Sequence, residues 1–539
     1  MRNRFLFSVY ALMLIASSCA IQVAPTGGEK DVKPPAVKKA TPENFSTLFN
    51  VKDISISFDE FIALKELNTQ LVVSPPLKHT PDINVKKKTL HIHLDDTLLV
   101  HTTYTMNFGN AITDIREGNA VEDFQYVFST GDVIDSLKIS GRVENALDKK
   151  TEKGIYILLY RSTDDSLPMK SLPDYFAKTT EDGSFEVKNV SSGNYRIFAL
   201  KDNNSNYLFD NSEEAIAFTT ETIEAGKSKS TLSLFKETRK QQLLKAEADE
   251  AGRVTLAYVL PLVNVKIEFL NDTSGMQLLP VSYSQKKDSL TFWYRNQLKD
   301  SLVFILQHDD MRDTLSIRLK ILDPKPRMKY PLVLTTQYIP RTVNGMDLNK
   351  SLHLVFNHPI DSFDLAKILV TEDSIAVKSL QIFFTDSLKR NLALDFPRKE
   401  KSSYAVEIPA GGLKDIFGLR NDSMQLLFRT KSVADYGTMA IQMKISIPGK
   451  NYILQLIDEK ETIYWTSTFN TDTTINYDFL DPKIYRLKII EDLNSNNEWD
   501  AGNYLQHKQP ERVFYYKESM TVRANWDVDV KWDLGSEGK

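Results

Sequence analysis

Short stretches in which apolar and polar residues alternate recur along most of this chain. The runs at 54–58, 90–94 and 104–108 have a period of two, which is typical of half-buried β-strands. Residues that favour turns follow several of these runs, as at Gly109-Asn110. The pattern therefore predicts an all-β protein.

The strand pattern of the first part of the chain returns about 300 residues later. Four landmarks occur in the same order in both copies: 54–58 and 352–356, Tyr104–Phe108 and Tyr404–Ile408, Thr113-Asp114 and Lys414-Asp415, Val127–Thr130 and Leu427–Thr430. Landmarks that repeat in order indicate a duplicated structural unit. The matching positions of Asp114 and Asp415 favour a role in turn geometry over acid–base chemistry.

These landmarks resemble the bacterial Ig-like domain first described in S-layer proteins. The order is a strand followed by Phe-x-x-x-Ile, a strand led by tyrosine, a turn containing Asp and a closing Phe-x-Thr. We assign one such domain to residues 34–132 and a second to 329–431. The lead-in at 25–35 also resembles Ig-like lipoproteins of Bacteroidota, which implies an envelope location.

A second type of module follows each Ig-like domain. Residues 137–143 open the first one, Asp182-Gly183 gives a hairpin signal, and a strand begins at Tyr195-Arg196. This order resembles the small prealbumin-like β-sandwich found beside carboxypeptidases as a regulatory domain. We assign it to residues 133–235. The C-terminal β-sandwich, 432–539, keeps the Tyr-Arg strand and the loop after it but lacks the Asp-Gly hairpin.

Between the two halves lies a block at 236–328, which we expect to be a β-rich spacer domain. Residues 236–251 are charged and could form a helix, but the turn-like Asp249–Gly252 and the strand-like 254–259 favour a hairpin. The whole chain is then expected to be an elongated multidomain rod of tandem β-sandwiches.

The N-terminus predicts a lipid anchor. Arg2 and Arg4 precede an apolar run that is much shorter than the ~20 residues of a membrane-spanning helix, as in a signal peptide. The run ends in Ala16-Ser17-Ser18-Cys19, which resembles a bacterial lipobox, and Cys19 is the only cysteine. We therefore expect residues 1–18 to be a lipoprotein signal peptide, Cys19 to carry lipid, and 19–33 to be a flexible tether.

Composition excludes some functions. Loss of residues 1–18 would change the net charge from −4 to −6, which gives no reason to expect a nucleic-acid partner. The sequence has no G-x-S-x-G elbow, H-E-x-x-H helix or P-loop. His91, His93 and His101 are close in sequence, but exposed strand histidines are commoner than metal sites. We expect no enzymatic activity and no catalytic residues.

One polar string occurs twice and is the best candidate for a binding site. It has the form D-x-N-x-N-x-x-x-D and follows a Tyr-Arg strand in both copies. Oxygen side chains at alternate positions are what Ca²⁺ requires, with spacing like that of an EF-hand but flanked by strands. The candidate calcium ligands are Asp202, Asn204, Asn206, Asp210 and Glu213 in the first loop, and Asp492, Asn494, Asn496 and Asp500 in the second.

Two interpretations of these loops stay open. Asn and Asp also collect in solvated turns, because they cap their own backbone and tolerate left-handed conformations. If Ca²⁺ binds, one ion per loop would stiffen it, and Glu214 and Glu511 are alternative carboxylate donors. Three nearby aromatic residues, which we take to be exposed, could instead stack on sugars: Tyr207, Trp499 and Tyr504. For Trp499 we favour the alternative that its side chain packs over the hairpin.

The sequence thus favours a non-catalytic, lipid-anchored scaffold or adaptor of the bacterial outer membrane. It would contact another outer-membrane protein or an envelope complex, on either the periplasmic or the outer face. The alternative is a surface glycan-binding or adhesive lipoprotein.

Overall fold

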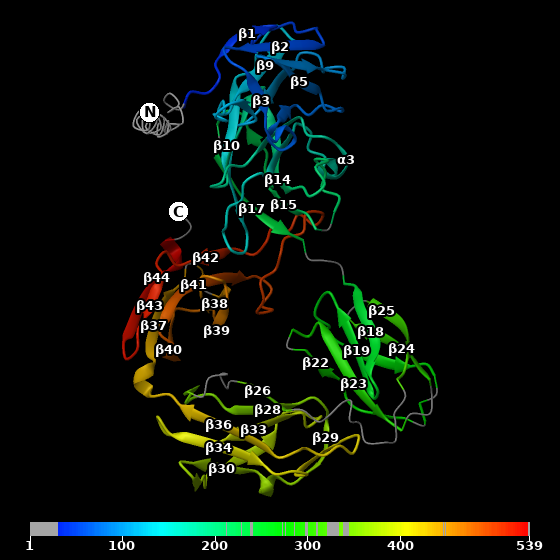
Figure 1. The fold of residues 1–539 in the computed structure, drawn as a ribbon, viewed down its shortest axis with the longest axis vertical. Helices are drawn as coiled ribbons and strands as arrows, with labels where there is room; N and C mark the ends of the chain where they lie inside the picture. Colours follow the sequence, from blue (N-terminus) through cyan, green and yellow to red (C-terminus); the bar gives the residue numbers. More distant parts are fainter. Residues whose placement is uncertain are drawn as a thin grey trace, which may run out of the picture. The chain divides into compact units, whose positions relative to one another are not determined.

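The computed structural model describes most of the chain beyond residue 30 (Figure 1). The described residues are 31–320, 334–337 and 344–536, apart from 212, 228, 238–240, 272, 275, 285, 297–299, 309–310, 446 and 448. The predicted signal peptide, Cys19 and most of the tether lie outside them. Within this range the chain is all β, with helical segments no longer than four residues. The predicted fold class is confirmed.

Contacts divide the chain into two compact units. Unit 1 comprises residues 1–145 and 150–234, and unit 2 comprises 146–149 and 235–539. Unit 1 holds the first Ig-like domain and the module after it. Unit 2 holds the spacer, the second Ig-like domain and the C-terminal module.

The two Ig-like domains share one strand order, and the second domain adds β27 and β31 at the edges of the sheet that corresponds to β4-β7-β9. The first contains sheets β1-β2-β6-β5, β3-β8 and β4-β7-β9, and the second contains β26-β28-β33-β32, β29-β35 and β27-β36-β34-β30-β31. The strands of the first domain are β1 (Val37–Thr41), β2 (Asp53–Phe58), β3 (Ile62–Leu64), β4 (Val72–Ser74), β5 (Asp82–Lys86), β6 (Thr89–His93), β7 (Thr103–Asn107), β8 (Ile112–Asp114) and β9 (Gln125–Ser129). Those of the second are β26 (Leu334–Gln337), β27 (Asn344–Met346), β28 (Leu352–Phe356), β29 (Ile360–Phe363), β30 (Leu369–Glu372), β31 (Ile375–Ala376), β32 (Gln381–Phe384), β33 (Asn391–Asp395), β34 (Ser403–Ile408), β35 (Leu413–Asp415) and β36 (Met424–Thr430).

Side-chain contacts repeat along with the strands. The rings of Tyr104 and Phe128 stack with centroids 5.4 Å apart, and those of Tyr404 and Phe428 repeat this separation. Each tyrosine hydroxyl accepts a hydrogen bond from a backbone N–H five residues earlier, at 2.9 Å in the first copy and 2.8 Å in the second. The duplication predicted from sequence landmarks is therefore present in atomic detail.

The spacer forms two small antiparallel sheets around its own apolar core. The hairpin expected after residue 242 is present, because β18 pairs with β19 in antiparallel register. The strands are β18 (Leu243–Glu250), β19 (Arg253–Tyr258), β20 (Lys266–Phe269), β21 (Gln277–Leu278), β22 (Ser282–Tyr283), β23 (Ser289–Arg295), β24 (Ser301–His308) and β25 (Met311–Arg318).

The two modules that follow the Ig-like domains also correspond strand for strand. In both, a parallel pair (β10-β17, β37-β44) joins strands from the two ends of the module. The edge order β12-β11-β14-β15 in the first becomes β39-β38-β41-β42 in the second. The sequence showed similarity between the two modules only in the Tyr-Arg strand and its loop, whereas the structure shows it over the whole module. The first module contains β10 (Leu137–Asn145), β11 (Tyr156–Tyr160), β12 (Tyr175–Lys178), β13 (Ser184–Val190), β14 (Asn194–Lys201), β15 (Ala215–Phe218), β16 (Ile223–Glu224) and β17 (Lys229–Lys236), and the second contains β37 (Gly437–Lys444), β38 (Asn451–Ile457), β39 (Ile463–Phe469), β40 (Thr473–Leu480), β41 (Lys483–Asp492), β42 (Val513–Tyr515), β43 (Met520–Val522) and β44 (Asp527–Asp533).

Close packing in the first module gives a direct test of its fold. A Cβ added at Gly141 would overlap the carbonyl oxygen of Ser230 and lie 2.7 Å from the Phe185 ring. Gly141→Ala should therefore lower the free energy of unfolding by about 1–3 kcal/mol, the usual cost of overpacking. Denaturant unfolding measures it. The neighbouring Ser140→Ala is the control and should change stability by less than about 0.5 kcal/mol; equal effects would contradict this packing.

Candidate functional site

The two polar loops occupy equivalent places in the two modules. The first joins β14 to β15 and the second joins β41 to β42. Both loops bend through left-handed residues at matching positions, Ser205 and Tyr207 in the first and Ser495 and Asn497 in the second, with φ between 62° and 63°. Such backbone angles are uncommon outside glycine, so their repetition marks one shared loop conformation.

The first aspartate of each loop organises the backbone. Asp202 accepts hydrogen bonds from the N–H groups of Asn204, Ser205 and Tyr207 at 3.0, 2.6 and 2.7 Å. Asp492 accepts from Asn496 and Asn497 at 3.1 and 3.0 Å. These are side-chain-capped turns, as the turn interpretation of the sequence expects.

The last aspartate of each loop lies beside the two asparagines. The Asn204 and Asn206 amides donate to Asp210 at 3.2 and 2.7 Å. In the second loop the amides of Asn494 and Asn496 both donate to Asp500. The structure therefore brings one predicted aspartate and two predicted asparagines together in each loop, while Asp202 and Asp492 face backbone N–H groups. It contains no group of three or more His, Cys, Asp or Glu residues suited to a metal within its described part.

A buried glutamate closes each loop from the inside. Glu214 is 1% exposed and accepts from the backbone of Asn203 at 3.2 Å and of Asp210 at 3.3 Å. Glu511 is 2% exposed and accepts from the backbone of Leu493 at 2.7 Å and of Asp500 at 3.0 Å. Burial raises the pKa of both glutamates. Glu213, the residue at position 12 of the predicted spacing, is exposed instead.

The three aromatic residues near the loops differ in exposure: Tyr207 and Trp499 are half-buried, and Trp499 packs on the module as the favoured interpretation expects, whereas the expected exposure of Tyr504 is wrong. Tyr504 is fully buried. The Tyr207 ring packs edge-on to Tyr156 at 5.1 Å between centroids, and the Trp499 indole N–H donates to the Glu511 carbonyl at 3.0 Å. These contacts hold the half-buried rings of Tyr207 and Trp499 against their own modules.

Two of the three N-terminal histidines, His91 and His93, contact polar side chains of the neighbouring strand. His91 contacts Ser55 at 3.2 Å across the β2–β6 pair, and His93 contacts Asp53 at 2.7 Å on the same pair. Both imidazoles are half-buried on the strand and contact a side chain of the neighbouring strand.

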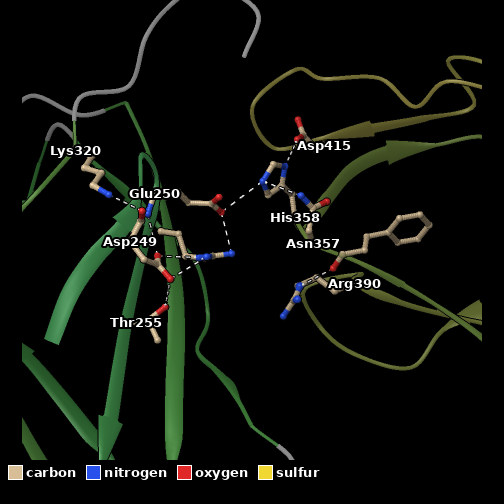
Figure 2. Close-up of polar contacts among 10 residues, drawn as sticks. Asp249, Glu250, Thr255, Lys320, Asn357, His358, Arg390 and Asp415 are labelled. Atoms are coloured by element: carbon tan, nitrogen blue, oxygen red, sulfur yellow. Dashed lines mark hydrogen bonds and ion pairs between the residues drawn. The ribbon is translucent and has the colours of Figure 1, made fainter. Parts of the chain in front are cut away.

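Unit 2 contains a buried charge cluster that the sequence did not reveal (Figure 2). His358 follows β28 and is fully buried. Its Nδ1 lies 2.7 Å from Asp415 Oδ2 at the end of β35, and its Nε2 lies 3.5 Å from Glu250 Oε1 at the end of β18. The imidazole therefore joins a carboxylate of its own Ig-like domain to a carboxylate of the spacer.

Neighbouring contacts strengthen this joint between the spacer and the second Ig-like domain. Trp293 of the spacer packs with Leu388 and Ile416 of the Ig-like domain. The guanidinium of Arg390 lies 4.8 Å from the Trp293 ring centroid. On the spacer side, Arg253 pairs with Glu250 at 3.0 Å and with Asp249 at 2.8 Å. Charge and apolar packing thus act at the same place.

Comparison of the two Ig-like domains shows which of these contacts are specific to the second domain. Asp114 and Asp415 both cap the turn after their strand, Asp114 through three backbone N–H groups and Asp415 through those of Phe417 and Leu419. The turn role expected for both aspartates is correct. In the first copy, however, Glu60 occupies the place that His358 takes after the preceding strand. Aligning the two copies is the sequence signal that would have singled out His358.

Comparison with known proteins agrees with this fold. Residues 31–130 match the model of the bacterial Ig-like domain, so the chain contains a bacterial Ig-like β-sandwich. No curated protein matches the sequence. Among solved structures, the S-layer protein SbsC is 11% identical over 90% of this chain and 67% of its own, with a TM-score of 0.14. The major pilin subunit BcpA of Bacillus cereus is 11% identical over 74% and 99%, with a TM-score of 0.14. The adhesin InvE of Yersinia pseudotuberculosis is 11% identical over 36% and 59%, with a TM-score of 0.13.

The buried histidine makes the stability of unit 2 depend on pH. Burial opposes protonation of His358, but its hydrogen bonds and charge contacts with Asp415 and Glu250 outweigh burial and raise its pKa. A raised pKa means that the protonated imidazole stabilises the fold. This contribution is complete below the unfolded pKa of about 6.5 and is lost as pH rises through the higher folded value.

We therefore expect the melting temperature of unit 2 to fall above neutral pH through this group. His358→Gln should destabilise the joint by about 3 kcal/mol, as when one member of a buried pair is removed, and should flatten this part of the pH profile. Thermal unfolding of the full chain over pH 6 to 9 (about the range in which His titrates) measures both effects. A pH profile unaffected by His358→Gln would refute the assignment.

Proposed function

We propose that this protein is a non-catalytic, lipid-anchored scaffold or adaptor of the bacterial cell envelope. The observation that carries the proposal is that the buried carboxylates of this chain stabilise its turns and loops. The most buried carboxylates, Asp114, Asp415, Glu214 and Glu511, all cap turns or close loops. These carboxylates stabilise the fold of the modules. A scaffold requires a series of stably folded domains such as these β-sandwiches.

The buried joint supports the same proposal. A scaffold must hold successive modules in fixed relation, and interdomain contacts that are small and polar usually allow motion. Here His358, Glu250 and Trp293 are all buried where the spacer meets the second Ig-like domain. This contact would keep two modules of unit 2 from moving independently.

The lipid anchor is the second element of the proposal, and it rests on the sequence. Cys19 at the end of a short apolar run would be the lipidated N-terminus after removal of residues 1–18. Within the described part of the chain no helix is long and apolar enough to cross a membrane. We place the protein at the outer membrane, with the face it occupies open.

Anchoring through Cys19 is tested by Cys19→Ser expressed in the native host. The wild-type protein should fractionate with the outer membrane, whereas Cys19→Ser should lose the thioether-linked lipid and move to the soluble envelope fraction. Mass spectrometry of the N-terminal peptide reads out the lipid directly. A membrane-bound, unlipidated wild type would refute the anchor.

The same strain tests the scaffold role. Deletion of the gene should change the protein composition of the outer membrane, and the wild-type gene but not Cys19→Ser should restore it. An unchanged composition after deletion would remove the basis of the proposal.

Calcium is the third element. In each loop two asparagine amides donate to the last aspartate while the first aspartate caps the turn, and we propose that one Ca²⁺ per loop replaces the amide contacts to Asp210 and Asp500. Amide-rich ligand sets are expected to bind weakly, with Kd of about 10⁻⁴–10⁻³ M as in extracellular modules. The ion would stiffen the loop rather than take part in a reaction.

Calcium binding predicts a measurable stabilisation. At about 10 mM Ca²⁺ each occupied loop should add about 1.4–2.7 kcal/mol to the free energy of unfolding. Thermal unfolding with and without Ca²⁺ measures it, and the same concentration of Mg²⁺ should give a smaller shift because Mg²⁺ demands stricter geometry. The double variant Asp210→Asn, Asp500→Asn should lose the Ca²⁺ shift. If Ca²⁺ does not change the melting temperature of the wild type, the calcium proposal is wrong and the loops are solvated turns.

A further inference from the structure

Unit 1 contains an open cleft between the first Ig-like domain and the module that follows it, with a volume of about 1310 Å³. The outward face of strands β10, β13 and β17 forms its floor, and residues of β4, β7 and β9 form one wall. Contacts between the two domains fix the wall to the floor. The Asn189 amide donates to Thr105 Oγ1 at 2.7 Å, and the Phe176 N–H donates to Ser74 Oγ at 3.1 Å. Ligand sites are common at such domain interfaces.

Hydrogen-bonding side chains make up much of the lining of this cleft. The described lining residues include nine serine and threonine hydroxyls and three asparagine or glutamine amides. A hydroxyl both donates and accepts hydrogen bonds, as the hydroxyls of a sugar do. The two aromatic residues among them, Phe176 and Phe185, are only 3% and 4% exposed, so they offer no ring face on which a nucleotide base could stack. The lining therefore suits a ligand with many hydroxyl groups.

Two of the three acidic side chains in the described lining are already paired inside the cleft. Lys138 Nζ lies 2.8 Å from Glu186 Oε2, and Lys188 Nζ lies 3.4 Å from Asp123 Oδ2. Asp123 also accepts a hydrogen bond from the Asn107 amide at 2.8 Å. These contacts neutralise most of the negative charge of the cleft.

Positive charge is in excess on the floor of the cleft. Lysine and arginine outnumber acidic residues by six to three in the described lining, although the net charge of the whole chain is −4. Arg142 of β10 and Lys229 of β17 are both exposed, and neither makes an ion pair with any residue that the structure describes. Because Ser140 lies opposite Lys229 in the parallel pair, the Cα atoms of Arg142 and Lys229 are about 8 Å apart. Both cations are therefore available to one anionic ligand.

The C-terminal module lacks this positive charge on its equivalent face. Strands β37 and β44 pair in parallel as β10 and β17 do, and a bulge at the start of β10 and of β37 sets the correspondence between them. Asp529 then occupies the place of Lys229, and Gln442 occupies the place of Arg142; both are exposed. Since the two modules share one fold, the fold does not require the two cations. They are a property of the first module.

We propose that this cleft binds an acidic polysaccharide. Arg142 and Lys229 pair with its acidic groups, and floor hydroxyls such as those of Ser140 and Thr231 hydrogen-bond its sugar hydroxyls. A guanidinium group suits this role because it binds an oxyanion through two parallel hydrogen bonds. The binding goes beyond the scaffold role and depends on neither the lipid anchor nor calcium.

The floor of the cleft favours a polysaccharide over an acidic polypeptide. Extended peptides commonly add to a free strand edge, and bound helices lay an apolar face into an apolar groove. Strand β10, at the centre of the floor, is paired on both sides, with β13 and with β17. It therefore offers side-chain hydroxyls and charges rather than free backbone groups.

Binding of two acidic polysaccharides to the purified full chain in mild detergent tests the proposal. Polygalacturonate carries carboxylates, dextran sulfate carries sulfates, and dextran is the neutral control. Each polymer is immobilised, and binding is followed by biolayer interferometry. Wild type should bind at least one acidic polymer and should not bind dextran, and the tighter polymer assigns the acidic group. The negative net charge of the chain opposes unspecific binding to a polyanion.

The double variant Arg142→Gln, Lys229→Gln should weaken this binding by at least about tenfold, because it removes two charge-assisted contacts. The double variant Lys444→Gln, Lys531→Gln is the matched control. It removes two exposed positive charges from the equivalent face of the C-terminal module and should leave binding unchanged. Since all four side chains are exposed, both variants should melt at the wild-type temperature.

Three results would overturn the proposal. The first is a wild type that binds neither acidic polymer. The second is equal weakening by the two double variants, which would show an effect of net charge alone. The third is binding of polyglutamate as tight as that of the better polysaccharide, which would assign the cleft to an acidic polypeptide.

Protection of an engineered thiol locates the bound polymer independently. Thr231→Cys places a thiol on the floor opposite Arg142, and Asn476→Cys places one on exposed β40 of the C-terminal module. With the better polysaccharide at ten times its Kd, maleimide should label Thr231→Cys about tenfold more slowly, because about one site in ten stays free. Labelling of Asn476→Cys should keep its rate. An unchanged rate for Thr231→Cys, or equal slowing of both variants, would refute binding in this cleft.

Discussion

Every sandwich in this chain depends on apolar side chains that close between paired β-sheets. One cysteine cannot form a disulfide within the chain, so packing and backbone pairing must supply the stability. The stacked Tyr104–Phe128 and Tyr404–Phe428 pairs show that the two duplicated cores pack alike, because the ring centroids are 5.4 Å apart in both. The buried turn-capping aspartates belong to this constraint, because they satisfy backbone groups at the ends of the core strands.

Once the cores are fixed, the two halves differ mainly at their surfaces. Glu60 in the first Ig-like domain becomes His358 in the second, where the spacer contributes Glu250 to the contact. Likewise β12 is covered within unit 1, while β39 is exposed. A duplicated fold therefore carries two different sets of interaction surfaces. The two copies thus share their interior packing and differ in the surfaces on which a function can be built.

The alternating pattern was sufficient to predict the all-β fold, the duplicated landmarks and the spacer hairpin, because strand periodicity is a local property. The Asp and Asn residues of each loop could also be grouped, since they lie close in sequence. Two kinds of feature could not be predicted from the sequence. The contact of His358 with Glu250 depends on packing between segments more than 100 residues apart. The choice between Glu213 and Glu214 depends on strand phase, because a shift of one residue moves a side chain to the other face.

The central claim is that the protein acts by contacting other envelope components. Its most direct test is purification of the tagged full chain from the cell envelope of its native host in mild detergent, followed by mass spectrometry. The account predicts a near-stoichiometric outer-membrane protein or envelope complex in the purified material. Recovery of the chain alone, with no second component at comparable amount, would contradict the adaptor role and favour glycans or host surfaces as its targets.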